Sequence, residues 1–166
     1  QRIGKGMIYA AWIVALLLLT LLFNHFLEQQ HNPNQELTVQ SYPNGTREVV
    51  LQRNRAGHYV ASGTLNGMPV VFLLDTGATI LSIPETIARR LNLSRGAPME
   101  VSTANGTVTT YSTTIDKVAL GPIELQQVKA SINPHTQEEE VLLGMSFLKQ
   151  LEFTQRGDTL MIRQTP

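Results

Sequence analysis

The sequence predicts a small, mainly β domain, closed or folded over on itself, preceded by a transmembrane helix. Residues 7–23 contain no charged side chain, whereas from residue 48 onward short apolar runs alternate with turns that contain Gly or Asn. Only one or two brief stretches have helical periodicity, so strands dominate the prediction. The 166 residues match the length of one folded domain, which is commonly about 100–200 residues.

The composition excludes several classes of function. The chain has no cysteine, which rules out thiol catalysis, disulfides and thiolate metal sites. Its formal net charge is zero, and no basic patch points to nucleic acid as a partner. His25 and His31 lack acidic or thiol companions at ligand spacing, so we interpret them as solvated residues. We therefore expect neither a metal nor a cofactor.

The first element is a transmembrane helix within residues 1–27, with Met7–Phe23 as its uncharged centre. A helix of this length spans about 26 Å, close to the lower limit for the hydrocarbon core of a bilayer. Phe26 and Leu27 extend the apolar stretch by a turn. A buried core helix would have a polar face, and this stretch has none. The alternative is a cleaved signal peptide, but Asn24-His25-Phe26 lacks the small-x-small pattern of a cleavage site.

The charges beside this helix predict its orientation. Arg2 and Lys5 precede the apolar stretch, and no Lys or Arg follows it before Arg47. The positive-inside rule then places the N-terminus in the cytoplasm. Everything after residue 28 is expected outside, in a periplasm-like space.

Residues 28–47 are predicted to form a linker and juxtamembrane segment, and residues 48–166 the folded domain. The stretch 28–36 is polar, contains proline and has no periodicity, which is typical of a linker.

The domain is expected to consist of short strands with one or two helices. Asn66-Gly67 supplies the two positive-φ residues of a tight hairpin. Ser82 and Glu85 have the spacing of a capping box, with Pro84 in the first turn of a helix, and a second short helix is expected over 144–151. Strands are expected at 48–51, 58–65, 70–74, 99–103, 107–112, 115–120, 123–132, 141–143 and 159–163.

The most informative stretch is the apolar strand 70–74, which ends directly on Asp75-Thr76-Gly77. A carboxylate beside a buried strand is costly unless it is used or paired. The triplet alone is a weak signal, but Ala78-Thr79 follows it and Val141-Leu142-Leu143-Gly144 lies downstream.

Together with His58-Tyr59, Asn66-Gly67, Ala88-Arg89-Arg90-Leu91, Thr103-Ala104-Asn105-Gly106 and Leu142–Leu148, this stretch resembles one family. It is the bacterial, membrane-anchored, retropepsin-like group of clan AA aspartic proteases, and the resemblance covers about residues 48–163. It implies a retropepsin-like closed β (acid protease) domain and an aspartic endopeptidase that acts on peptides or proteins. It also implies a single-pass protein of the bacterial inner membrane whose domain faces the periplasm. Leu74 departs from the valine that is frequent there.

Aspartic proteases need two carboxylates that share one proton around a water molecule. Asp116 and Asp158 lie in other contexts, so Asp75 is the one suitable carboxylate in this chain. A two-fold axis places each residue opposite its own copy. Activity is therefore expected to require a homodimer, and the dimer is expected to be weak.

The resemblance also assigns roles around Asp75. Thr76 is expected to hydrogen-bond across the dimer axis, and Gly77 to let its amide approach the carboxylate. Leu143 and Gly144 are expected to brace the turn from behind. Residues 101–108 occupy the place of a flap over the substrate. The expected substrate contacts are Ala78, Thr103, Ala104, Asn105 and Gly106.

Two other readings stay open at this stage. One is a catalytically idle, membrane-tethered binding or scaffolding module on the same fold, because a fold does not guarantee a function. The other is a small ligand-binding β-barrel with an anchor, which would need a wide apolar lumen. The flap-like hairpin and the helix after Asp75 favour the protease.

Overall fold

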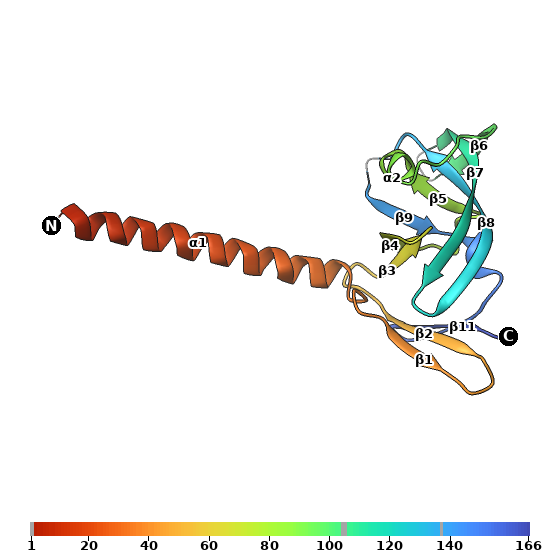
Figure 1. The fold of residues 1–166 in the computed structure, drawn as a ribbon, viewed down its shortest axis with the longest axis horizontal. Coiled ribbons are helices and arrows are strands. Elements are labelled where there is room, and N and C mark those ends of the chain that lie inside the picture. The colour runs from red at the N-terminus through yellow and green to blue at the C-terminus, as the bar shows by residue number, and fades with distance from the viewer. Residues whose placement is uncertain (1, 104–105, 137) are drawn as a thin grey trace.

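The computed structural model describes residues 2–103, 106–136 and 138–166. A long helix, α1 (Arg2–His31), projects from a β domain that contains two sheets and two short helices (Figure 1). The prediction of a mainly β domain behind an apolar N-terminal helix is confirmed.

Helix α1 is long and apolar enough to cross a membrane, and none of its apolar window is buried against the domain. Its large side chains are exposed on all sides, from Met7 through Trp12 to Phe26. A helix that is apolar all round needs an apolar environment, and the domain does not provide one.

The smaller sheet has four antiparallel strands in the order β1-β2-β11-β10. Its strands are β1 (Thr38–Ser41), β2 (Arg47–Gln52), β10 (Glu152–Arg156) and β11 (Thr159–Gln164). Val49, Leu51 and Ile162 on its central strands are fully buried. Residues from both ends of the domain therefore share one sheet, and both edge strands are exposed.

The larger sheet has seven strands in the order β3-β4-β9-β5-β8-β7-β6, and an additional pairing of β3 with β7 closes it. The strands are β3 (Tyr59–Leu65), β4 (Met68–Leu74), β5 (Leu81–Pro84), β6 (Pro98–Thr103), β7 (Gly106–Leu120), β8 (Ile123–Asn133) and β9 (Glu140–Leu143). Asn66 and Gly67 join β3 to β4 with φ of 49° and 82°, as a tight hairpin requires.

Closure of this sheet depends on a glycine. Gly63 lies on β3 between β4 and β7, and a Cβ there would approach the Phe72 ring to 2.4 Å and the Ala119 carbonyl oxygen to 2.5 Å. Any side chain would push one of the two neighbouring strands away, and the fully buried Phe72 could not keep its place.

The secondary structure differs from the prediction in several places. Strands β5 and β10 were not expected, and the two strands predicted at 107–112 and 115–120 are the single strand β7. Helix α3 (Met145–Leu148) is shorter than predicted. The capping box is wrong: Ser82 pairs within β5, and α2 (Glu85–Arg90) has Pro84 as its N-cap residue without a side-chain cap. The reason is tertiary, because the Ser82 backbone joins β5 to β8 and β9.

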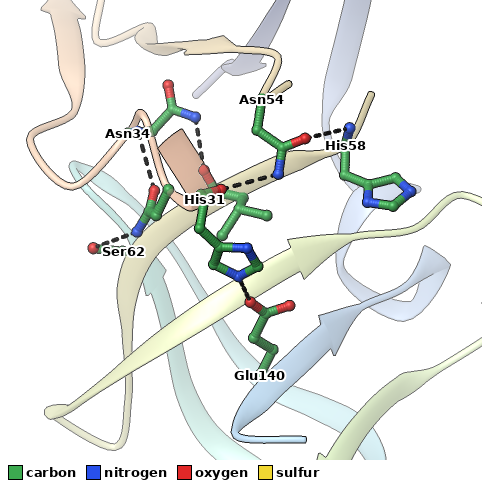
Figure 2. A network of polar contacts seen from close by, with 8 residues as sticks. His31, Asn34, Asn54, His58, Ser62 and Glu140 are labelled. Carbon is green, nitrogen blue, oxygen red and sulfur yellow. Dashed lines mark hydrogen bonds and ion pairs between the residues drawn. The ribbon is translucent and has the colours of Figure 1, made fainter. Parts of the chain in front are cut away.

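The segment predicted as a linker is folded against the domain. Helix α1 continues to His31, and Asn34 forms a parallel bridge with Ala61 of β3. Asn54 donates from Nδ2 to the His31 carbonyl oxygen at 2.9 Å, and the His31 ring contacts the Glu140 carboxylate (Figure 2). We call this contact region, made by residues 31–34 with Asn54, Ser62 and Glu140, the anchor joint.

Asn34 is the centre of the anchor joint and is 3% exposed. Its Nδ2 donates to the carbonyl oxygens of Gln52 at 2.8 Å and Val60 at 2.7 Å, and its Oδ1 accepts from the Gln52 amide at 2.6 Å. One amide side chain thus bridges β2 and β3, which belong to different sheets. A polar side chain used in this way is not distinguishable from a linker residue by composition.

We expect Asn34→Ala to lower the free energy of unfolding by about 2–4 kcal/mol, because three backbone groups lose their partner. Urea denaturation of the full chain in detergent measures this. Asn44→Ala is the matched control, since the exposed Asn44 side chain accepts from the Thr46 amide and, among the described residues, from no other group. Equal stability of the two variants would contradict the bridging role of Asn34.

Candidate active site

Asp75 follows the last residue of β4 and is held by backbone hydrogen bonds on both sides. Its amide donates to the Leu143 carbonyl oxygen at 3.3 Å, and its own carbonyl oxygen accepts from the Ala78 amide at 3.2 Å. The Gly77 amide donates to Asp75 Oδ1 at 2.8 Å. The turn therefore orients the half-buried carboxylate through the backbone, while Thr76 and Gly77 stay exposed at the surface of the single chain.

The turn is closed from behind by the end of β9. The Met145 amide donates to the Ala78 carbonyl oxygen at 2.8 Å. A Cβ on Gly144 would lie 2.5 Å from the Ile80 carbonyl oxygen and 2.7 Å from that of Ala78. Only glycine allows this approach of two backbones. The structure thus brings Leu143 and Gly144 against the Asp75 turn.

Ser146 also holds this region, and the sequence analysis assigned it no role. Its buried side chain accepts from the Leu81 amide through Oγ at 2.9 Å. This contact fixes the start of β5 just after the Asp75 turn. The available signal was a serine within the otherwise apolar helix that begins directly after Gly144.

A cavity of about 620 Å³ opens beside Asp75. Gly77 and Ala78 line it at the turn, and Leu142 and Ser131 line its floor. The β6–β7 hairpin forms its other wall through Met99, Glu100, Val101, Ser102, Val108 and Thr110. Met99 pairs with Thr110 and Val101 with Val108 across the hairpin, so these four residues share one face of it.

The predicted substrate contacts are divided by this arrangement. Ala78 lines the cavity. Thr103 and Gly106 pair in the backbone register of the β6–β7 hairpin, and Ala104 and Asn105 lie outside the described residues. Met99 and Thr110 were not predicted, whereas Val101 and Val108 lie in the segment 101–108 that was predicted as a flap over the substrate. Their alternation on either side of the Asn-Gly turn was the signal that could have found them.

The chain before the hairpin is fixed by charge. Glu85 at the start of α2 contacts Arg95 at 2.5 Å and Arg89 at 2.9 Å, and the Arg95 guanidinium lies 4.7 Å from the centre of the Tyr111 ring. The hydrogen bond from Arg95, followed by that from Arg89, lowers the pKa of Glu85. Its ionised form therefore persists at pH values where an ordinary Glu is protonated, and its stabilising effect is lost as the pH falls through the lowered pKa.

In the described ranges, no group of three His, Cys, Asp or Glu side chains is arranged to hold a metal ion. The cavity presents a carboxylate held by the Gly77 amide next to an extended hairpin, whose wall residues Met99, Val101 and Val108 are apolar. Such a carboxylate can act on a water molecule next to a bound peptide.

Comparisons with known proteins agree with this geometry. A family model described as "gag-polyprotein putative aspartyl protease" matches residues 61–150. An uncharacterized protein in the cobV 5′ region of Sinorhizobium sp is 29% identical over 176 residues, which cover 98% of this chain and 76% of that protein.

The chain also resembles a solved structure, a retropepsin-like aspartic protease from Rickettsia conorii. The two share 24% sequence identity with a TM-score of 0.61, over 77% of this chain and 95% of the other. At this identity the likeness shows the fold, which is the retropepsin-like fold predicted from the sequence. The family model, in addition, spans more than half of the 166 residues. The chain therefore belongs to the retropepsin-like aspartyl protease family.

Proposed function

We propose that this chain is a membrane-anchored aspartic endopeptidase, in which two Asp75 carboxylates across a homodimer axis activate a water molecule. The observation that carries the proposal is the placement of Asp75. Its carboxylate is fixed by the Gly77 amide at 2.8 Å and lies at the cavity bounded by the β6–β7 hairpin. An Asp side chain that accepts from the amide two residues on is common in structural turns, so the cavity beside this carboxylate is what supports a catalytic role.

In the proposed mechanism one carboxylate of the pair is ionised and the other carries a proton. The ionised Asp75 takes a proton from the water molecule while the water oxygen attacks the carbonyl carbon of the peptide bond. The protonated Asp75 donates to the carbonyl oxygen. The C–N bond of the resulting tetrahedral intermediate then breaks as the leaving amine takes a proton from one aspartate, and a hydroxyl proton of the intermediate passes to the other aspartate, which restores the singly protonated pair. Two like charges this close cannot both ionise readily, so we expect activity at acidic pH.

The second carboxylate must come from a second copy of the chain. The exposure of Thr76 and Gly77 supports this, because these residues would be covered if two turns met at a two-fold axis. In that arrangement Thr76 would hydrogen-bond across the axis, and the substrate would add as a strand between the cavity floor and the hairpin.

Helix α1 is proposed to anchor the enzyme in the bacterial inner membrane with the domain in the periplasm. Its length and apolar surface support insertion, and Arg2 and Lys5 at its N-terminal end support this orientation. The Sinorhizobium relative, similar over nearly the whole chain, supports a bacterial setting.

The decisive test is cleavage of a peptide library by the full chain in detergent between pH about 4 and 7, beside Asp75→Asn. We expect cleavage by the wild type and a loss of at least about a thousandfold in the variant, because amide nitrogen and oxygen cannot replace the base. The variant has the same size and should fold. Equal cleavage by both proteins would refute the mechanism, and silence of both would favour the idle binding module.

Dimerisation is tested by mixing wild-type and Asp75→Asn chains in equal amounts at constant total concentration. Random exchange leaves about one quarter of the dimers with two aspartates, so activity should fall to about one quarter. An active monomer would instead retain one half. We further expect a weak dimer in detergent, since anchoring in a membrane already concentrates the chains. A dimer that persists at nanomolar concentration in detergent would contradict this expectation.

Gly144→Ala tests the brace behind the turn. The new Cβ would meet two backbone oxygens of the Asp75 turn, so we expect a loss of about 1–3 kcal/mol of stability. Activity should fall about a hundredfold, as for a displacement of roughly 1 Å in a catalytic group. Gly6→Ala in α1, where a Cβ meets no atom within 4 Å, is the control. Unchanged activity in Gly144→Ala would remove the brace from the proposal.

A further inference from the structure

The distance between the end of α1 and Asp75 is set by a single strand. Glu140, the first residue of β9, contacts the His31 ring at the end of the helix (Figure 2). Leu143, the last residue of β9, accepts from the Asp75 amide. A strand rises about 3.3 Å per residue, so β9 spans about 10 Å between these two contacts. The strand therefore connects the membrane helix directly to the catalytic turn.

A second path has the same short length. Asn34 pairs with Ala61, Ala61 pairs with Phe72, and Phe72 lies three residues before Asp75. Asn34 is buried and hydrogen-bonded to both β2 and β3. Because both paths consist of paired or hydrogen-bonded residues, the domain cannot swing on α1 as it would on a flexible linker.

These contacts limit the height of the active site above the membrane. Leu27 is the last apolar residue of α1, and four further helical residues raise His31 by about 6 Å. Adding β9 and the side chains of His31 and Glu140 places Asp75 within about 30 Å of the hydrocarbon boundary, whatever the tilt of the helix. In a dimer with both helices in one membrane the two-fold axis follows the membrane normal, so both Asp75 residues have the same height.

We infer that the substrates are other membrane-anchored proteins, cut in an extracytoplasmic segment within about 30 Å of the same bilayer. This inference rests on the proposed function, including the anchor. An anchored substrate shares the two-dimensional concentration of the enzyme and presents its juxtamembrane stalk at the height of the cavity. Such a stalk can enter as an extended strand beside the β6–β7 hairpin. Cleavage sites on domains far from the membrane are out of reach, because the anchor joint contains no flexible segment that would let the catalytic domain move away from the bilayer.

The experiment uses the full chain in liposomes with single-span reporter proteins. Each reporter carries the same cleavable sequence, taken from the peptide library, on a helical stalk that places it about 15 Å or about 60 Å above the bilayer. We expect the low site to be cut at least about ten times faster than the high site. The free peptide and Asp75→Asn are included in every assay.

Two insertions between Leu27 and Glu28 test whether the anchor joint causes the preference for the low cleavage site. A helical insert of about 22 residues raises the domain by about 33 Å and should reverse the preference toward the high site. A Gly/Ser insert of the same length is a flexible coil and should abolish the discrimination between heights. Both variants should cleave the free peptide at the wild-type rate, because the domain and its joint are unchanged.

The outcomes separate this inference from the proposed function. Cleavage of the free peptide together with equal rates at both heights would overturn the height limit and leave the protease intact. A preference that neither insertion changes would also overturn it. If the wild type cuts neither the free peptide nor any reporter, the proposed function fails and this inference fails with it.

Discussion

The parallel pairing of β4 with β9 is the constraint on which the rest of the domain depends. Leu73 and Leu74 pair with Leu142 and Leu143 in the same direction, so the chain must leave at Asp75 and return at the opposite end of the same pair. Strands β5 to β8 and helix α2 form that return. They provide Ser131 and the hairpin wall of the cavity, so the carboxylate at the end of β4 lies beside a cavity of about 620 Å³.

The polar groups near Asp75 are arranged so that the backbone, rather than side chains, holds the carboxylate. Amides of Gly77 and Ala78 and the Leu143 carbonyl oxygen define the turn, and glycine at 144 lets the second backbone approach. Among the charged side chains, Glu100 lines the same cavity, and Glu85 ties α2 to Arg95 and so to the chain that enters the hairpin. A site built in this way orients the carboxylate through Oδ1, which accepts from the Gly77 amide.

The sequence predicted those parts of the fold that local patterns determine. The hairpin at Asn66-Gly67, the buried strand before Asp75 and the glycine after Leu143 all follow from backbone preferences that a few residues express. Strand β5 was missed because its central position is defined by neighbours far away in the sequence, β8 and β9. The same pairing overrode the capping pattern at Ser82. Met99 and Thr110 of the cavity wall were missed because their contribution depends on which face of the hairpin turns inward.

The anchor joint shows why composition misled the prediction there. Segments rich in Asn, Gln and Pro are typical of linkers because they bury too little apolar surface to order themselves. Here Asn32, Asn34 and Asn54 are buried. Asn32 and Asn34 donate hydrogen bonds to β3, and Asn54 donates to the carbonyl oxygen at the end of α1. The amides of Asn34 and Asn54 bond to backbone carbonyl oxygens and that of Asn32 to the Ser62 hydroxyl, so order comes from hydrogen bonds that the folded domain offers. The same polar residues that suggest a loose tether therefore connect the end of the apolar helix to the domain that carries the Asp75 turn.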